Sequence, residues 1–241
     1  MSAPLFLVPA LPDGPTYTLT GPEGHHAASV QRLRPGEVVV LADGRGGTAD
    51  ATVVAPGRGG KGALALSVTG RRYEEPPDPR LVVVQGIAKG ERGELAVQAM
   101  TEAGVDEIVP WAASRSVALW RGERGERSRE KWAATAREAA KQARRAWVPP
   151  VTEQAATRHV VKRPNLLVLH EEATDRLSGV ELPATGEITL VVGPEGGISH
   201  DEVDAFREAG GRTVRLGASV LRTSTAGVAA IAVLSARLGR W

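Results

Sequence analysis

The sequence predicts an α/β protein in which a small β-rich domain precedes a larger domain built on a mostly parallel sheet. In the first part, short apolar runs such as "EVVVLAD" are separated by glycine-rich turns such as "GRGG", which is typical of a small all-β barrel or sandwich. In the second part, longer apolar runs such as "RLVVVQGIA" alternate with helical segments. Continuous apolar strands that alternate with helices indicate a parallel sheet covered on both faces.

The length and composition favour two folded domains. The chain has 241 residues, more than the usual single domain of about 100 to 200 residues. We expect a β domain at residues 1–72, a linker rich in proline and charge at 73–80, and an α/β domain at 81–241. Cysteine is absent, which excludes disulfides, zinc–thiolate sites and thiol nucleophiles.

We expect no targeting or membrane segment in this sequence. The apolar run near the start is interrupted by Pro4, Pro9 and Pro12 and follows no basic residue, unlike a signal peptide. No stretch approaches the roughly 20 apolar residues of a membrane span. We therefore expect a cytoplasmic protein.

The individual elements follow from these patterns. In the first domain, strands are expected at 37–43, 48–55 and 63–70, with turns at 44–47 and 56–62. In the second domain, strands are expected at 80–88, 106–112, 165–171, 187–193 and 213–217. Helices are expected at 91–104, 128–147 and 199–210, with a last helix after residue 222.

A glycine-rich loop, "GPEGG" at 193–197, lies between a predicted strand and a predicted helix. Ser199 and Glu202 have the spacing of a capping box and mark the start of that helix. Open α/β sheets bind ligands where strands end in this way. The loop matches neither phosphate fingerprint, and Glu195 would repel a polyphosphate but tolerate a neutral adenosine or a cation. A tight turn with a surface glutamate is the alternative.

A second loop of the same kind precedes the last helix. The segment "VRLGASVLRTSTAG" runs from a short strand through Gly217 into a helix that Thr223, Ser224 or Thr225 could cap. Two such loops at neighbouring strand ends predict one cleft.

These two loops carry a resemblance to a known family. "VVGPEGGIS" followed by "RLGASVLRTSTA" resembles the C-terminal motifs of the SPOUT methyltransferases. Together with "GHHAASVQRLRPGE", "GIAKGERGELAVQAMTEAGVDEIVPWAASRS" and "REAAKQARRAWVPPV", they resemble the ribosomal RNA small subunit methyltransferase E family over nearly the whole chain. That family methylates N3 of a uridine in 16S ribosomal RNA with S-adenosylmethionine.

The resemblance implies a fold, an assembly and a cofactor site. The fold is a PUA-like β-barrel joined to a SPOUT domain with a C-terminal trefoil knot, and the assembly is a homodimer with cofactor pockets at its interface. Family members usually carry a glutamate where this chain has Ser224. The positions that match the cofactor site are Leu169, His170, Glu171, Gly193, Pro194, Glu195, Gly196, Gly197, Ile198, Leu216, Gly217, Ser219, Val220, Leu221, Arg222 and Thr223.

The implied chemistry needs no cysteine. A thiolate is normally required to methylate carbon 5 of a pyrimidine, whereas a nitrogen or oxygen acceptor needs no covalent step. Uracil N3 carries a proton, so its removal leaves negative charge on the ring oxygens. We expect Arg222 to stabilise that charge, with a structural salt bridge as the alternative. Glu195 could accept the proton or orient the cofactor, and His170 could act as a base or be an ordinary packed histidine.

Positive charge is concentrated between residues 121 and 147, where nine Lys or Arg side chains face four Glu. The run indicates either phosphate contacts or a solvated basic face.

Trp132 and Trp147 are expected in the core. Adjacent histidines at 25 and 26 point apart and do not suit one metal ion, so no metal site is expected. The residues expected to contact RNA are His25, His26, Arg32, Arg34, Lys89, Arg115, Arg137, Lys141 and Arg144.

The sequence therefore favours an S-adenosylmethionine-dependent methyltransferase acting at uridine N3 of 16S ribosomal RNA within the small ribosomal subunit. One alternative is a related SPOUT enzyme that methylates ribose 2′-oxygen or another base. The other is a non-catalytic RNA-binding protein of ribosome assembly, which only the change at Ser224 supports.

Overall fold

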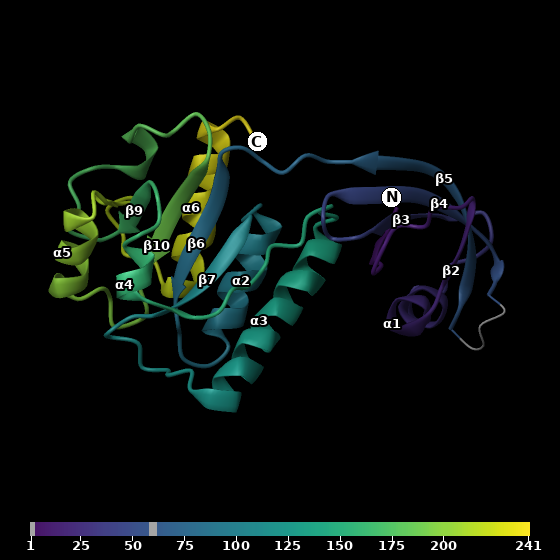
Figure 1. The fold of residues 1–241 in the computed structure, drawn as a ribbon, viewed down its shortest axis with the longest axis horizontal. Helices are drawn as coiled ribbons and strands as arrows, with labels where there is room; N and C mark the ends of the chain where they lie inside the picture. The colour runs from purple at the N-terminus through teal and green to yellow at the C-terminus, as the bar shows by residue number, and fades with distance from the viewer. Residues whose placement is uncertain (1–2, 58–61) are drawn as a thin grey trace. The chain divides into compact units, whose positions relative to one another are not determined.

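The computed structural model describes residues 3–57 and 62–241 and divides into two compact units (Figure 1). The first unit consists of Met1–Pro76 and Ala140–Val148, and the second of Pro77–Ala139 and Pro149–Trp241. The segment Ala140–Val148 was expected in the second domain. It groups with the first unit because Trp147 Nε1 donates a hydrogen bond to Glu74 O at 2.9 Å and the neighbouring bridge joins Trp147 to Arg45.

The first unit contains a five-stranded mixed sheet with the order β1-β3-β4-β5-β2. β1 runs parallel to β3, and the other pairs are antiparallel. Residues of β4 alternate between buried and partly exposed, which places one face of the sheet on a core. The strands are β1 (Leu5–Leu7), β2 (Thr16–Leu19), β3 (Val38–Ala42), β4 (Gly47–Pro56) and β5 (Leu64–Tyr73).

Two helical turns complete this unit and were not predicted. α1 (Gly21–His25) continues into a π-helix, η1 (His26–Val30), and the side chain of Ala27 is buried in the sheet core. Glycine and proline in this segment are typical of turns, but a proline in the first helical turn loses no hydrogen bond. Of the expected turn at 56–62, residues 58–61 lie outside the described residues.

The second unit contains the expected parallel sheet, with six strands in the order β11-β9-β10-β6-β7-β8. Every pairing in it is parallel. The order brings β10 next to β6, although about 100 residues separate them in the chain. The strands are β6 (Arg80–Gly86), β7 (Glu107–Ala112), β8 (Ala155–Ala156), β9 (Leu166–Leu169), β10 (Glu187–Val192) and β11 (Arg212–Val214).

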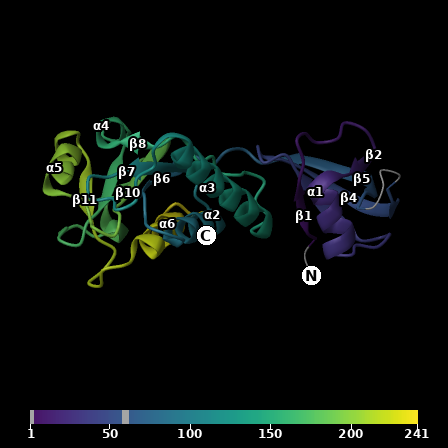
Figure 2. The ribbon, with the colours of Figure 1, turned by 90° about the horizontal axis from the view of Figure 1, so that it is seen from below.

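Helices cover both faces of this sheet, which explains the continuous apolar strands. On β6, Leu81 and Val83 pack in one cluster with α2, α3 and α6, whereas Val82 and Val84 pack in another with α4 and α5. Figure 2 shows α2 and α6 on one side of the sheet and α4 and α5 on the other. The helices are α2 (Arg92–Glu102), α3 (Gly122–Gln142), α4 (Thr157–Val160), α5 (His200–Glu208) and α6 (Thr223–Arg237).

The long basic helix differs from its prediction at both ends. It was expected at 128–147 but spans Gly122–Gln142. Glycine disfavours helix interiors, yet Gly125 packs so tightly that an added Cβ would lie 2.8 Å from the carbonyl carbon of Trp120. The absence of a side chain at Gly125 therefore allows the first turns of the helix to lie close to Trp120. Arg144 adopts a left-handed backbone, φ 54°, which a helix cannot continue through.

The loop between β9 and β10 crosses the C-terminal part of the chain. Arg215 N donates to Asp175 O, and Leu177 N donates to Arg215 O, both at 2.9 Å. Leu177, in the short 3₁₀ turn η2 (Leu177–Gly179), is fully buried against α6, and Arg237 donates to its carbonyl oxygen at 3.0 Å. This loop thus contacts the C-terminal stretch both before and near the end of α6.

Within residues 3–57 and 62–241, no helix is long and apolar enough to cross a membrane. The same part of the chain holds no group of three or more His, Asp or Glu side chains that could bind a metal ion.

The start of α5 is held by a buried carboxylate. Ser199 and Glu202 form the predicted capping box. Glu202 also accepts hydrogen bonds from Ser114 N at 2.8 Å and from Thr157 Oγ1 at 3.0 Å, so it joins three segments. Burial raises the pKa of Glu202, but hydrogen bonds from Ser114 and Ser199 outweigh burial and hold the pKa below its ordinary value of 4.5.

We predict that Glu202→Gln lowers the free energy of unfolding at pH 7 by about 1–3 kcal/mol, because donors that face the carboxylate lose an acceptor. A carboxyl group whose pKa is lowered by folding stabilises the protein above its unfolded value and loses that contribution as pH falls through the folded value. The difference between wild type and variant should therefore shrink below pH 4.5. Urea unfolding at several pH values measures it.

Glu208→Gln, at the exposed end of the same helix, is the matched control and should change stability by less than about 0.5 kcal/mol. A destabilisation by Glu202→Gln that stays constant from neutral to acidic pH would contradict the assigned role of the carboxylate.

Candidate functional site

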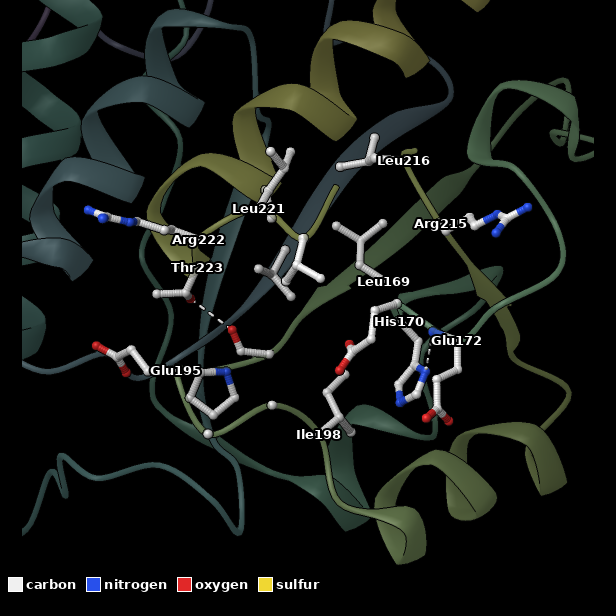
Figure 3. A pocket seen from close by; sticks show the side chains of 18 of the residues that line it. Leu169, His170, Glu172, Glu195, Ile198, Arg215, Leu216, Leu221, Arg222 and Thr223 are labelled. Atoms are coloured by element: carbon white, nitrogen blue, oxygen red, sulfur yellow. Dashed lines mark hydrogen bonds between the residues drawn. The ribbon is translucent and has the colours of Figure 1, made fainter. Parts of the chain in front are cut away.

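A cleft of about 670 Å³ lies at the carboxyl ends of the parallel strands (Figure 3). Three loops form most of its wall, and they follow β9, β10 and β11. Arg92 and Arg115, which lie after β6 and β7, complete it. Since all these strands are parallel, their carboxyl ends meet at one edge of the sheet, where this architecture binds ligands.

Every residue that the resemblance assigns to the cofactor lines this cleft. The prediction that two glycine loops form one cleft is thereby confirmed, and the loop after β9 joins them. Arg115, expected to contact RNA, also lines it. The lining residues that the sequence analysis did not single out are Arg92, Glu172, Val192, His200, Val214, Arg215, Ala218 and Ala226.

The shape of the GPEGG loop depends on its glycines. A Cβ on Gly193 would lie 2.9 Å from Ile198 Cγ1, and one on Gly196 would lie 2.8 Å from Arg115 O. Gly197 adopts φ 73°, a left-handed backbone that favours glycine. The loop is therefore folded tightly on itself and against the loop after β7, and side chains at these positions would displace it.

Glu195 links the GPEGG loop to the segment after β6. Its Oε1 accepts a hydrogen bond from Lys89 N at 3.0 Å and from Arg92 Nη1 at 3.2 Å. Burial raises the pKa of Glu195, but backbone N–H groups and Arg92 outweigh burial and lower the pKa overall. A carboxylate with a lowered pKa is a weak base at neutral pH. The geometry thus favours positioning over proton acceptance for Glu195.

The hydroxyl groups at the start of α6 do not cap the helix, so that prediction was wrong. The N-cap residue is Arg222, and its side chain makes no capping hydrogen bond. Thr223 Oγ1 instead donates to Gly193 O at 2.8 Å, drawn as a dashed line in Figure 3, and Thr225 Oγ1 donates to Arg222 O. Ser224 is buried and does not line the cleft.

The two ends of the cleft differ in chemistry. Leu169, Leu216 and Leu221 form an apolar wall in its middle, while Figure 3 shows His170 and Glu172 together at one end. His170 Nδ1 accepts a hydrogen bond from Glu172 N at 3.3 Å. In the neutral ring this leaves the proton on Nε2, so His170 resembles an ordinary hydrogen-bonded histidine more than a base.

Arg222 lies at the other end of the cleft. Its side chain is exposed and forms no salt bridge within the described part of the chain, so the structural ion pair considered as an alternative is not observed. In Figure 3 the side chains of Arg222 and Glu195 both extend to the left, away from Leu169 and Leu216. An unpaired guanidinium beside a cleft can stabilise negative charge on a ligand.

The structure contradicts one of the predicted RNA-contacting residues, Lys141, and divides the others between the two units. Lys141 is buried and lies 2.9 Å from Glu23 Oε1, so it forms a core ion pair within the first unit instead of an exposed basic face. His26 is half-buried, with its ring against Phe6. The exposed remainder are His25, Arg32, Arg34 and Arg144 in the first unit and Lys89, Arg115 and Arg137 in the second.

The two tryptophans that were expected in the core differ in burial. Trp132 is buried in the second unit and packs edge to face on Trp120, with ring centroids 4.9 Å apart, as predicted. Trp147 is only half-buried in the first unit, where it packs on Tyr73.

Comparisons with known proteins agree on one family. Residues 74–235 match the sequence model of an RNA methyltransferase domain, and residues 19–61 match that of an RNA methyltransferase PUA domain. The chain is 45% identical to the ribosomal RNA small subunit methyltransferase E of Mycobacterium bovis, covering 100% of this chain and 94% of that protein. It is 29% identical to the protein of the same name from Bacillus subtilis, covering 92% of this chain and 91% of that protein.

A solved structure is similar over both units. The ribosomal RNA small subunit methyltransferase E of Neisseria gonorrhoeae, in a structure bound to S-adenosyl methionine, has a TM-score of 0.86 and 28% identity and covers 98% of each chain. The match of one domain model to two thirds of the chain and the full-length relative together define the assignment. The chain belongs to the ribosomal RNA small subunit methyltransferase E family.

Proposed function

We propose that this protein transfers a methyl group from S-adenosylmethionine to N3 of a uridine in 16S ribosomal RNA of the small ribosomal subunit. The observation that carries the proposal is the single cleft to which the loops after β9, β10 and β11 all contribute. The names of the full-length relatives support the substrate. Cytoplasm, where ribosomal subunits assemble, is the proposed location.

The lining of the cleft suits an adenosine-bearing sulfonium. The volume of about 670 Å³ is within the usual range of roughly 300 to 1,000 Å³ for small-molecule pockets. Leu169, Leu216 and Leu221 offer an apolar surface for a heterocycle, and Glu171 and Glu172 offer negative charge to a cation. When bound, S-adenosylmethionine supplies an activated methyl group.

The side chains around the cleft have different proposed roles toward the uracil ring. Loss of the N3 proton leaves charge on the uracil oxygens, and we assign the stabilisation of that charge to Arg222, an exposed residue that lines the cleft. Glu195 has a lowered pKa and His170 Nδ1 already accepts a hydrogen bond, so neither acts as the principal base. Alignment of two held reactants can supply on the order of 7 to 11 kcal/mol, and we assign most of the acceleration to it.

The proposed RNA contacts are the exposed basic residues of each unit. Arg32 and Arg34 serve in the first unit, and Lys89, Arg115 and Arg137 in the second. Basic side chains of this kind bind phosphates without reading sequence. Specificity for one uridine then depends on the shape of the folded RNA around it.

We also propose the homodimer and the knot. One face of α6 is buried in the core, Ala229 and Ala232 on its other face stay partly exposed, and Val228 and Val233 at the edges of the buried face are also partly exposed, which supports packing against a second copy. The crossing of the β9–β10 loop over Arg215 and α6 supports the knot, since a chain threaded through that loop would make these contacts.

The reaction is tested by supplying S-adenosylmethionine with a labelled methyl group to assembled small subunits and to naked 16S RNA, followed by mass spectrometry of the nucleosides. The proposal predicts 3-methyluridine. A 2′-O-methylated or otherwise methylated nucleoside would contradict the assigned position, and cofactor binding without transfer to either RNA would leave a non-catalytic RNA-binding protein.

We predict that Arg222→Ala lowers single-turnover methyl transfer by about 100-fold, as for loss of one donor to developing negative charge. The affinity for S-adenosylmethionine, measured by calorimetry, should change by less than about threefold, because the charge forms only during reaction. Arg222→Lys keeps the charge without the planar fork and should recover part of the rate. An Arg222→Ala variant as fast as wild type would remove Arg222 from the mechanism.

We predict that Arg137→Ala weakens RNA binding and reduces the slope of log K against log salt by about 1, because one phosphate contact is lost. Arg207→Ala is the matched control, since Arg207 is an exposed arginine of α5 on the other face of the sheet. Salt titrations of RNA binding compare the two variants. Equal slopes for Arg137→Ala and wild type would mean that Arg137 belongs to a solvated face.

A further inference from the structure

A buried glutamine is connected to the cleft through one threonine. Gln85, the penultimate residue of β6, is fully buried and does not line the cleft. Its Nε2 donates to Thr223 Oγ1 at 2.8 Å, and Thr223 Oγ1 donates to Gly193 O at 2.8 Å. Two hydrogen bonds in series therefore lead from the centre of the sheet to the first residue of the GPEGG loop.

The direction of both hydrogen bonds is determined by their partners. Gln85 Nε2 lies 3.2 Å from Gly86 O as well as near Thr223, so the donor end of the amide faces two acceptors. With the amide reversed, two carbonyl oxygens would face each other, and the single hydroxyl proton of Thr223 would go to Gln85. The observed orientation leaves that proton for Gly193 O.

The side-chain amide of Gln85 reduces the stability of the fold at its buried position. Gln85 Oε1 is buried and has no hydrogen-bond partner among the described residues. A buried acceptor without a partner destabilises a fold, and an apolar side chain of the same size would avoid this. α6 packs closely beside this amide, since a Cβ on Gly227 would lie 2.5 Å from Met100 Sδ and 3.6 Å from Gln85 Oε1. The hydrogen bond that Gln85 Nε2 donates to Thr223 must therefore contribute something that offsets the cost of the unpaired Oε1.

The neighbouring residue also contacts the loop. A Cβ on Gly86 would lie 2.5 Å from Pro194 N, so the backbones of β6 and the GPEGG loop are in direct contact. Gly86 thus sets how close Pro194 lies, while Gln85 sets which way the carbonyl of Gly193 points. Gln85 and Gly86, which are adjacent in β6, therefore position Gly193 and Pro194, which are adjacent in the loop.

We propose that Gln85 is a positioning residue for the cofactor: through Thr223 it holds the Gly193 carbonyl, and with it the GPEGG loop, in the shape that receives S-adenosylmethionine. Gln85 contacts neither reactant. The inference rests on the proposed function of the cleft. It predicts that the donor of Gln85 and the hydroxyl of Thr223 act as one unit, so that removing both costs no more than removing the more important one.

Calorimetric titration of S-adenosylmethionine tests this with Gln85→Met, Thr223→Val and the double variant. Gln85→Met keeps the side-chain size and should raise the Kd about fivefold to tenfold, the equivalent of one hydrogen bond. Thr223→Val should raise the Kd at least as much, and the double variant should match Thr223→Val within about twofold. Thr223→Ser, which keeps the hydroxyl, should bind within about twofold of wild type.

Met100→Leu is the matched control, because it changes the same packed neighbourhood without removing a donor, and it should leave the Kd within about twofold of wild type. A Gln85→Met variant that binds as tightly as wild type, or a double variant whose loss equals the product of the single losses, would overturn the inference. If Gln85→Met does not fold, equal affinities for Thr223→Val and Thr223→Ser would overturn it alone. Failure of the wild type to bind the cofactor would instead overturn the proposed function.

Discussion

The contact between the end of β6 and the GPEGG loop is the constraint on which the site depends. At Gly86 the strand approaches Pro194 so closely that no side chain fits between them. Thr223, at the start of α6, donates a hydrogen bond to Gly193 O, and Glu195 accepts one from Lys89 N after β6. The loop is therefore held from three directions. A loop fixed in this way presents its backbone to a ligand without losing conformational entropy on binding. Preorganisation, more than any single acid or base, is what this cleft offers.

The parallel sheet makes this arrangement possible. Burial on both faces fixes the register of β6 and β10, since shifting either strand by one residue would exchange its two apolar faces. With the register fixed, the loops after β9, β10 and β11 meet at one edge, and residues such as Leu169, Gly193 and Leu216 become neighbours. The chemistry assigned to Arg222 then needs only an unpaired charge at the rim of a preformed cleft.

Much of this could be predicted because both-face burial produces continuous apolar runs and because loops at strand ends carry glycine. The failures have particular physical causes. The start of α3 was missed because glycine has a low helix propensity, whereas Gly125 lies inside the helix at a position where a side chain would collide with Trp120. Thr223, Ser224 or Thr225 was expected to cap α6, but the hydroxyl of Thr223 donates its hydrogen bond to Gly193 O. Lys141 was expected on a basic face, but Glu23, far away in the chain, pairs with it in the core. Gln85 has no sequence pattern at all, since its role depends on a partner 138 residues away.

The central claim is that close packing of β6 on the GPEGG loop shapes the cofactor site, and the most direct measurement is the affinity of Gly86→Ala for S-adenosylmethionine. An added Cβ would press on the backbone nitrogen of Pro194, so the loop must move. We expect a folded variant whose Kd is more than about tenfold above that of wild type, whereas Gly179→Ala, where the added Cβ meets nothing within 4 Å, should bind as wild type does. A folded Gly86→Ala variant with wild-type affinity would contradict the account.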